Sequence, residues 1–136
     1  MDSFGIFEVS ASALDAERRR MDAIASNMAN AGSTKSESGG PYQKREVVFS
    51  PVPVGDGQDD LEGVKVSGVV KENDFKRVYD PSNPDADKKG FVEMPNINVV
   101  EEMVDMMTAY RAYEASVQTF NISKSMLEKA LQLGGQ

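Results

Sequence analysis

The chain has 136 residues with a net charge of −7, and this acidic balance argues against nucleic-acid binding, which requires clustered Lys and Arg. It contains no Cys, His or Trp, which excludes disulfides and thiolate metal sites and removes the commonest general base of enzymes. No apolar run approaches the roughly 18 residues of a membrane span, and the first ten residues lack the features of a secretory signal.

Helix-breaking residues collect in the middle of the chain. All six prolines lie between Pro41 and Pro95, and eight of the eleven glycines lie between Gly32 and Gly90. The two ends are therefore free to form long helices. We predict a mainly α fold, in which two terminal helices pack as an antiparallel coiled-coil-like hairpin around a small β-rich insertion. Its three segments are an N-terminal helix (1–31), a linker with the insertion (32–96) and a C-terminal helix (97–136).

The first predicted helix, near residues 4–30, carries apolar side chains at intervals of seven. This row and the start of its companion row comprise Phe4, Phe7, Leu14, Met21 and Met28. The segment ends in SNMANAGST, where Asn27, Asn30 and Gly32 tolerate a left-handed C-cap.

The middle of the chain is rich in β-branched residues. Residues 42–49 and 64–70 have strand composition, and 75–79 follow the turn-like Glu72-Asn73-Asp74, which predicts a hairpin between the last two strands. Residues 50–63 form an acidic loop whose side chains are expected to be solvated. Its acidic residues are Asp56, Asp59, Asp60 and Glu62.

One stretch resembles the start of a calcium-binding loop. Asn83, Asp85 and Asp87 have the spacing of its first ligands, but Lys88 stands where glycine is needed and Met94 where a bidentate Glu is needed. No nucleophile–base pair, phosphate-binding loop or nucleotide fingerprint is present. We therefore expect no catalytic residue, no metal ion and no cofactor.

The C-terminal segment predicts a helix over about 98–131. Asn98 and Glu101 have the spacing of a capping box, and Gly134-Gly135 supply the stop. Two heptad rows run along it. Their members are Val99, Met106, Tyr113, Phe120 and Leu127, and beside them Met103, Tyr110, Val117 and Leu131.

Further apolar residues lie outside these rows. They are Ile24 in the first helix and Val100, Val104, Met107 and Ile122 in the second. Because a two-helix hairpin has only one seam, we expect such positions to contact additional partners. Methionine suits surfaces that adapt to several neighbours.

Three stretches of this sequence resemble the axial proteins of the bacterial flagellum. They are SNMANAGSTK, PNINVVEEMVDMMTAYRAYEASVQTFNISKSM and YDPSNPDADKKGFVEMPN, the last being similar to the stretch typical of the C-type proximal-rod members of the basal-body rod family. The matching signature residues are Asn27, Asn30, Asp80, Pro81, Pro84, Asp85, Asp87, Pro95 and Asn96.

This resemblance implies a structural subunit of the proximal rod in the periplasmic space. Such subunits pass unfolded through the flagellar type III export apparatus without a cleaved signal, and assemble helically with other rod subunits and neighbouring basal-body components. The rod encloses the export channel and transmits torque from rotor to hook. The resemblance implies neither nucleic-acid binding nor insertion into a membrane. Two alternatives remain: a cytoplasmic coiled-coil or helical-hairpin interaction module, and a secretion-system needle-type protein.

Overall fold

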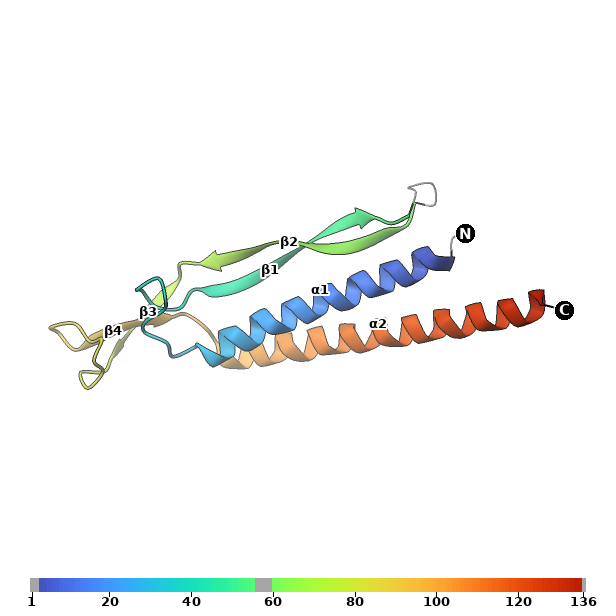
Figure 1. The fold of residues 1–136 in the computed structure, drawn as a ribbon. Coiled ribbons are helices and arrows are strands. Elements are labelled where there is room, and N and C mark those ends of the chain that lie inside the picture. Colours follow the sequence, from blue (N-terminus) through green and yellow to red (C-terminus); the bar gives the residue numbers. More distant parts are fainter. Residues whose placement is uncertain (1–2, 56–59, 136) are drawn as a thin grey trace.

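A computed structural model describes residues 3–55 and 60–135 and contains two long helices separated by two two-stranded sheets (Figure 1). The elements in chain order are α1 (Ser3–Ala29), β1 (Lys44–Pro53), β2 (Glu62–Glu72), β3 (Phe75–Tyr79), β4 (Phe91–Pro95) and α2 (Val99–Gly134). The predicted terminal helices and the β-rich insertion between them are confirmed.

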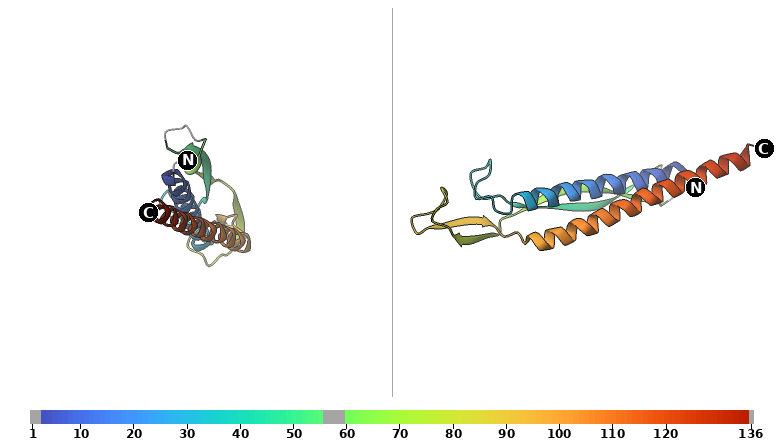
Figure 2. Two further views of the ribbon diagram at one scale, coloured as in Figure 1. Left: turned by 90° about the vertical axis from the view of Figure 1, so that its right-hand side faces the viewer. Right: turned by 90° about the horizontal axis from the view of Figure 1, so that it is seen from below.

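The molecule is long and thin, and α1 forms its middle layer. The ribbon of β1 and β2 runs along one side of α1, and α2 runs along the other (Figures 1 and 2). The two chain ends lie at the same end of the molecule, while β3 and β4 project at the opposite end (Figure 1). Phe7 accordingly stacks edge-to-face on Phe120, with ring centroids 5.1 Å apart.

Small side chains let α1 lie close to both neighbours. Ala16 in α1 and Ala109 in α2 are almost completely buried. On the ribbon side, the Ser12 hydroxyl donates to the Val9 carbonyl (2.7 Å) and accepts from the Val64 backbone amide (3.1 Å). The alanine-rich composition of α1 therefore serves close packing as well as helix propensity.

The strand pairing differs from the predicted hairpin. β1 pairs antiparallel with β2, from Lys44 opposite Glu72 to Pro53 opposite Glu62, whereas β3 pairs with β4. The prediction that residues 64–70 pair with 75–79 was wrong, because the turn around Asp87 folds β4 back onto β3 as its partner. β4 was not anticipated from its five residues, two of which are Met94 and Pro95.

The acidic loop is also shorter than expected. Residues 50–53 belong to β1 and residues 62–63 to β2. Asp60 and Glu62 are exposed, and the expectation for Asp56 and Asp59 concerns positions outside the described residues.

The predicted capping residues are confirmed for α2 but not for α1. The Asn98 side chain accepts hydrogen bonds from the backbone amides of Val100 (3.0 Å) and Glu101 (3.4 Å), which confirms the N-cap, and Gly135 is the C-cap. The prediction of a left-handed C-cap at the end of α1 was wrong. Among the described residues with positive φ, none is Asn27, Asn30 or Gly32. Asn30 instead caps through its side chain, which donates to the Ser26 carbonyl at 2.8 Å.

We predict that Gly63→Ala destabilises the contact between α1 and the ribbon. A Cβ atom there would lie 2.7 Å from the Ser12 hydroxyl oxygen and 3.1 Å from a methyl group of Val54. Crowding of this kind costs about 1–3 kcal/mol, which urea unfolding followed by circular dichroism would measure.

Gly68→Ala is the matched control in the same strand. A Cβ atom there meets nothing within 4 Å, so this change should be neutral or stabilising by up to about 1 kcal/mol. Equal destabilisation by the two substitutions would contradict the packing of Gly63 against Ser12.

Candidate interaction surface

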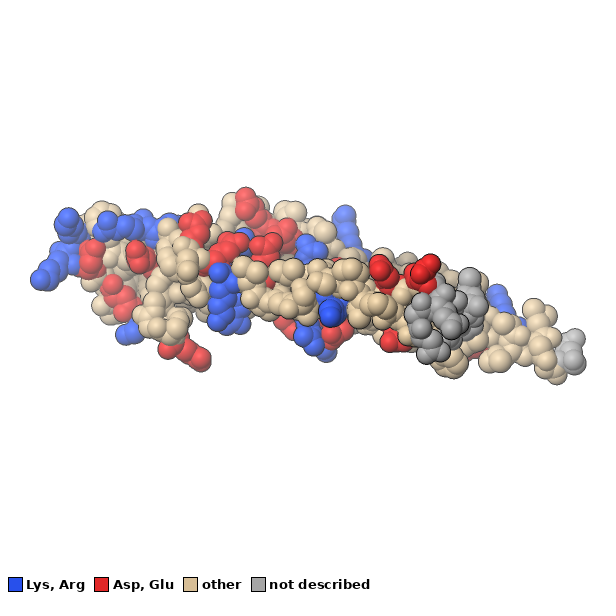
Figure 3. All heavy atoms as spheres, turned by 90° about the horizontal axis from the view of Figure 1, so that it is seen from above, with Lys and Arg blue, Asp and Glu red and all other residues tan. Residues whose placement is uncertain are grey.

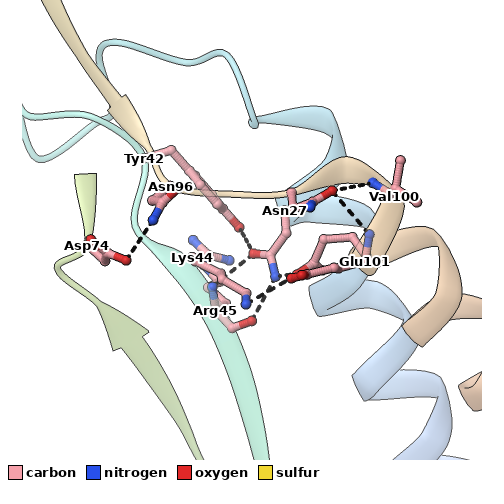
Figure 4. A network of polar contacts seen from close by, with 10 residues as sticks. Asn27, Tyr42, Lys44, Arg45, Asp74, Asn96, Val100 and Glu101 are labelled. Carbon is pink, nitrogen blue, oxygen red and sulfur yellow. Dashed lines mark hydrogen bonds and ion pairs between the residues drawn. The ribbon is translucent and has the colours of Figure 1, made fainter. Parts of the chain in front are cut away.

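A buried polar cluster sets the relative position of α1, β1 and α2 (Figure 4). The Asn27 side-chain nitrogen donates to the Arg45 carbonyl (2.9 Å) and to a Glu102 carboxylate oxygen (3.2 Å). Its side-chain oxygen accepts from the Arg45 backbone amide and the Tyr42 hydroxyl, both at 2.9 Å. Asn27 is only 1% exposed. Both N–H groups and both oxygen lone pairs of this amide are thus engaged.

Glu102 brings a buried negative charge into the cluster. Its side chain is 3% exposed, and the Lys44 ammonium lies 3.5 Å from one carboxylate oxygen. Burial lowers the pKa of Lys44, but the carboxylates of Glu102, Glu72 and Glu46 outweigh this effect and hold the pKa above its ordinary value. Lys44 therefore stays charged and neutralises Glu102.

Glu17 lies in α1 with little compensation for its burial. One of its carboxylate oxygens is buried without a hydrogen-bond partner, and the Arg20 guanidinium is 3.7 Å away. Burial raises the pKa of Glu17, and the charge of Arg20 opposes this rise only in part. Because the folded state holds the proton more tightly, Glu17 costs stability as the pH rises through the range between its unfolded and folded pKa values.

The predicted heptad residues fall into two groups in the single chain. Half-buried side chains occur in both helices, and the Phe7–Phe120 pair shows them meeting. This half-buried group comprises Phe7, Leu14, Met21, Met28, Met106, Tyr113, Val117, Phe120 and Leu127. The other residues are exposed, namely Phe4, Val99, Met103, Tyr110 and Leu131.

The innermost face of α2 lies one residue before the predicted companion row. Glu102 and Ala109, seven residues apart, are the two buried residues of this helix, whereas Met103 and Tyr110 beside them are exposed. The sequence reasoning selected the larger apolar side chains and so missed this small and acidic row. A repeat of seven through Glu102, Ala109, Ser116 and Ser123 is the signal that could have revealed it.

The apolar residues outside the predicted rows are also of two kinds, buried and exposed. Ile24 is buried within the chain, so its expected outside partner is not needed. On α2, by contrast, Val100, Val104, Met107 and Ile122 are all more than half exposed. Together with the exposed heptad residues, these side chains make the outer surface of α2 apolar near its start and near its end.

The chain exposes more surface than a compact folded protein of the same mass. Its accessible surface is 9391 Å², whereas a folded monomer of 14.8 kDa is expected to expose roughly 7,000 Å². Part of this surface consists of large apolar side chains of α2 that are more than half exposed, and clustered exposed apolar side chains mark an interaction surface. Seen from the ribbon side, Lys, Arg, Asp and Glu intermingle over most of the length, and uncharged surface prevails toward the C-terminal end (Figure 3).

The signature residues near the β3–β4 end build a firmly held loop. The Asp87 carboxylate accepts from the backbone amides of Phe91 (3.0 Å) and Lys89 (2.8 Å) and pairs with Arg77 at 3.0 Å. The bond from Phe91 is the main reason that the pKa of Asp87 is lowered. Asp85 accepts from the Thr34 hydroxyl at 2.8 Å, which ties the loop to the segment after α1.

The other signature positions lie around this loop and at its junction with α2. Asn96 donates to the Asp74 carboxylate at 2.9 Å, Asp80 donates its backbone amide to the Gly90 carbonyl, and Pro95 is fully buried. Pro81 and Pro84 are exposed in the loop. Asn27, far away in the sequence, belongs instead to the buried cluster.

The surface of the described residues contains clefts, but neither a cluster of metal ligands nor a membrane-spanning helix. A cleft of about 210 Å³ lies beside the polar cluster, between Ile24, Val47 and Glu102. Within residues 3–55 and 60–135, no group of three His, Cys, Asp or Glu side chains is placed to hold a metal ion. In the same part of the chain, neither helix is long and apolar enough to cross a membrane.

We predict that Glu102→Gln destabilises the fold by about 1–3 kcal/mol, because Lys44 loses the charge that faces it and Asn27 loses a charged acceptor. Urea unfolding at neutral pH would measure the change. Glu102→Ala should cost at least as much, since it also leaves a cavity.

Glu17→Gln is the matched control, since it is the same substitution in the other helix. It removes a partly buried carboxylate in which one oxygen accepts no hydrogen bond, so it should leave stability unchanged or increased at neutral pH. Comparable destabilisation by both substitutions would contradict a specific role for the cluster.

Comparisons with known proteins match both helices and nearly the whole chain. Residues 7–34 match the family model "Flagella basal body rod protein", and residues 88–133 match "Flagellar basal body rod FlgEFG protein C-terminal". The "Flagellar basal-body rod protein FlgC" of Salmonella typhimurium is 44% identical, covering 98% of this chain and 99% of that protein.

Relatives of the same name occur in distant bacteria. The protein of Borreliella burgdorferi is 39% identical over 98% of each chain, and that of Aquifex aeolicus is 41% identical over 97% of each chain. Both α1 and α2, with their exposed apolar faces and the loop before α2, therefore lie within the matched region. The chain belongs to the flagellar basal-body rod protein family, and within it to the proximal-rod C proteins named FlgC.

Proposed function

We propose that this structural, non-enzymatic rod subunit works by helix packing alone. Its terminal helices act together as an antiparallel coiled-coil-like hairpin, and their outer faces pack against the helices of neighbouring subunits. Repetition of this contact along a helical path builds a tube. The tube encloses the export channel and transmits torque from rotor to hook.

The observation that carries this proposal is the exposure of large apolar side chains on α2. The chain exposes roughly 2,400 Å² more than expected for its mass, an area within the range of obligate interfaces. Exposed apolar side chains occur near the start of α2, where Val99 and Met103 lie, and near its end, where Leu133 lies. A monomer gains nothing from such a face, whereas a polymer buries it in every subunit.

We assign separate tasks to the three segments. Segments 1–31 and 97–136 are the rod-core helices, and the fourteen predicted interface residues, Phe4 to Leu131, contribute to packing either within the subunit or between subunits. Segment 32–96 braces α1 through the ribbon and presents the loop around Asp87 at the opposite end from the chain termini. Because its hydrogen bonds hold that loop in one conformation, the loop is suited to contact another basal-body component.

The partners are other rod subunits, neighbouring basal-body components and the export apparatus. A thin core and the absence of cysteine suit a chain that passes unfolded through a narrow channel and then folds in the periplasmic space. No nucleic acid and no membrane insertion enter this proposal.

We predict that Phe120→Asp abolishes rod assembly and swimming. Phe120 packs on Phe7 between the two helices, so a carboxylate there must be buried unpaired or must hold the helices apart. Either outcome costs at least about 2 kcal/mol per subunit, and the loss repeats throughout the polymer. Met106→Asp and Tyr113→Asp, on the same heptad row, should behave alike. Basal bodies isolated from cells that carry only the variant provide the measurement.

Asp60→Asn is the control. Asp60 is exposed and has a φ of 49°, which asparagine tolerates, so rods and swimming should be normal. Variant amounts in the cell must be compared by immunoblot. Normal rods with Phe120→Asp would rule out this row as a packing seam, and absence of the unaltered chain from purified basal bodies would overturn the proposed function itself.

A further inference from the structure

Hydrogen bonds at the β1–β2 ribbon identify which of its backbone groups point outward. In an antiparallel pair, the amides and carbonyls of alternate residues point away from the partner strand. Asn27 bonds to both the amide and the carbonyl of Arg45, each at 2.9 Å, so Arg45 is an outward residue of β1. At the other end, the Val54 amide donates to the Leu61 carbonyl across the ribbon, which fits the same alternation. The outward residues of β1 are therefore Arg45, Val47, Phe49, Pro51 and Pro53.

Both ends of the β1 edge and the start of the β2 edge are closed to a further strand. Asn27 occupies the start of β1, and Pro51 and Pro53 near its end have no N–H group to offer. Near the start of β2, the Val64 amide donates to the Ser12 hydroxyl at 3.1 Å. Proline at outward positions and bonded side chains both prevent a sheet edge from pairing with further strands.

The last residues of β2 form an open part of the ribbon edge. Val69 and Lys71 lie directly opposite Val47 and Arg45, so their amides and carbonyls also point outward. Within residues 3–55 and 60–135, no group bonds to these outward backbone groups. This end of β2 also lies farther from α1 than β1 does (Figure 1). A further strand can therefore pair here without displacing any described residue.

A groove of about 470 Å³ lies beside this open edge, between α1 and the ribbon. Val69 forms part of its lining and is more than half exposed. The other apolar residues of the lining are Ala23, Val47 and Val66. A strand added to β2 would direct every second side chain toward α1. The groove would therefore receive apolar side chains of the added strand.

The charges around the groove favour an acidic occupant. Its lining contains Arg19, Arg45 and Lys71 but only one acid, Asp22. Asp15 pairs with Arg19 at 3.1 Å, whereas no described carboxylate lies within ion-pair distance of Arg45 or Lys71. These last two cations stand directly opposite each other in the ribbon, and like charges in such positions destabilise a strand pair. A carboxylate from a partner would offset this repulsion.

We propose that the end of β2 binds an extended acidic segment of another chain by strand addition. The segment bonds to the outward amides and carbonyls of Val69 and Lys71 as a third strand. Its apolar side chains cover the groove, and a carboxylate lies between Arg45 and Lys71. This surface is on the side of α1 opposite α2 (Figure 1), so the inference goes beyond helix packing and does not depend on it.

Binding of a short fluorescent peptide to the purified full chain tests this site. The probe alternates valine and glutamate, and fluorescence anisotropy measures its affinity. Two control peptides should bind at least about tenfold more weakly. One alternates valine and lysine, and the other carries a methyl group on every backbone nitrogen of the valine–glutamate sequence. No binding of the unmodified valine–glutamate peptide, or equal binding of all three peptides, would overturn the proposal.

Val69→Pro removes an outward N–H group from the open edge. The ribbon already accommodates Pro51 and Pro53 at outward positions, so this variant should remain folded and lose the peptide. Val70→Pro is the matched control, because the amide of Val70 points toward Glu46 in β1. It should lower the midpoint of urea unfolding more than Val69→Pro does. Equal destabilisation would contradict the outward position of Val69, and undiminished binding by Val69→Pro would overturn strand addition.

Lys71→Glu tests the charge without altering the backbone. It also ends the repulsion with Arg45, so the chain should be at least as stable to urea, while the valine–glutamate peptide should bind at least about tenfold more weakly. Lys65→Glu makes the same change at an exposed site earlier in β2 and should leave the affinity nearly unchanged. Equal losses of affinity in both variants would show an effect of overall charge alone and would overturn the site.

Discussion

The side-chain amide of Asn27 is the point at which α1, β1 and α2 are bonded to one another. It donates to the Arg45 carbonyl and to Glu102, and it accepts from Tyr42 and from the Arg45 backbone amide. An unpaired buried polar group costs about 1–3 kcal/mol, so these groups are satisfied together only when the three elements take this one arrangement. The cluster lies at one end of the helix pair and the Phe7–Phe120 contact near the other. Together they fix the register of α2 along α1.

In this arrangement the β1–β2 ribbon, α1 and α2 each form one layer of the molecule. Within the described residues, α1 lies between the β1–β2 ribbon and α2, and α2 packs on α1 along one face (Figure 2). A chain of this length could bury much more of its apolar surface in a compact domain. The elongated form uses that surface differently, since the outer face of α2 remains available to other subunits. The polar bonds around Asn27 give the thin structure a defined geometry that its small core would not supply alone.

Much of this could be predicted from the sequence, for identifiable reasons. Confinement of proline to residues 41–95 revealed the two helices, and Asn98 revealed the start of α2, because both signals are local. The partner of β3 could not be found in this way, since it depends on the loop that Asp87 holds together. The cluster around Asn27 was missed because Asn27 and Glu102 are 75 residues apart in sequence, and no periodic pattern links an amide to a distant carboxylate.

The buried row of α2 lies one residue before the predicted row. This difference shows which apolar side chains face α1 and which face outward. Periodicity favoured Met103 and Tyr110 as seam residues because they are large, yet Ala109 occupies the seam and Tyr110 stays outside. Ala16 and Ala109 bring the helices close at these positions, and the larger seam side chains such as Phe7 and Phe120 are only half buried. Each large side chain on the outer face retains about 1.5–3 kcal/mol that burial can contribute. We propose that packing against neighbouring subunits supplies this contribution, so that the subunit reaches its full stability only in the polymer.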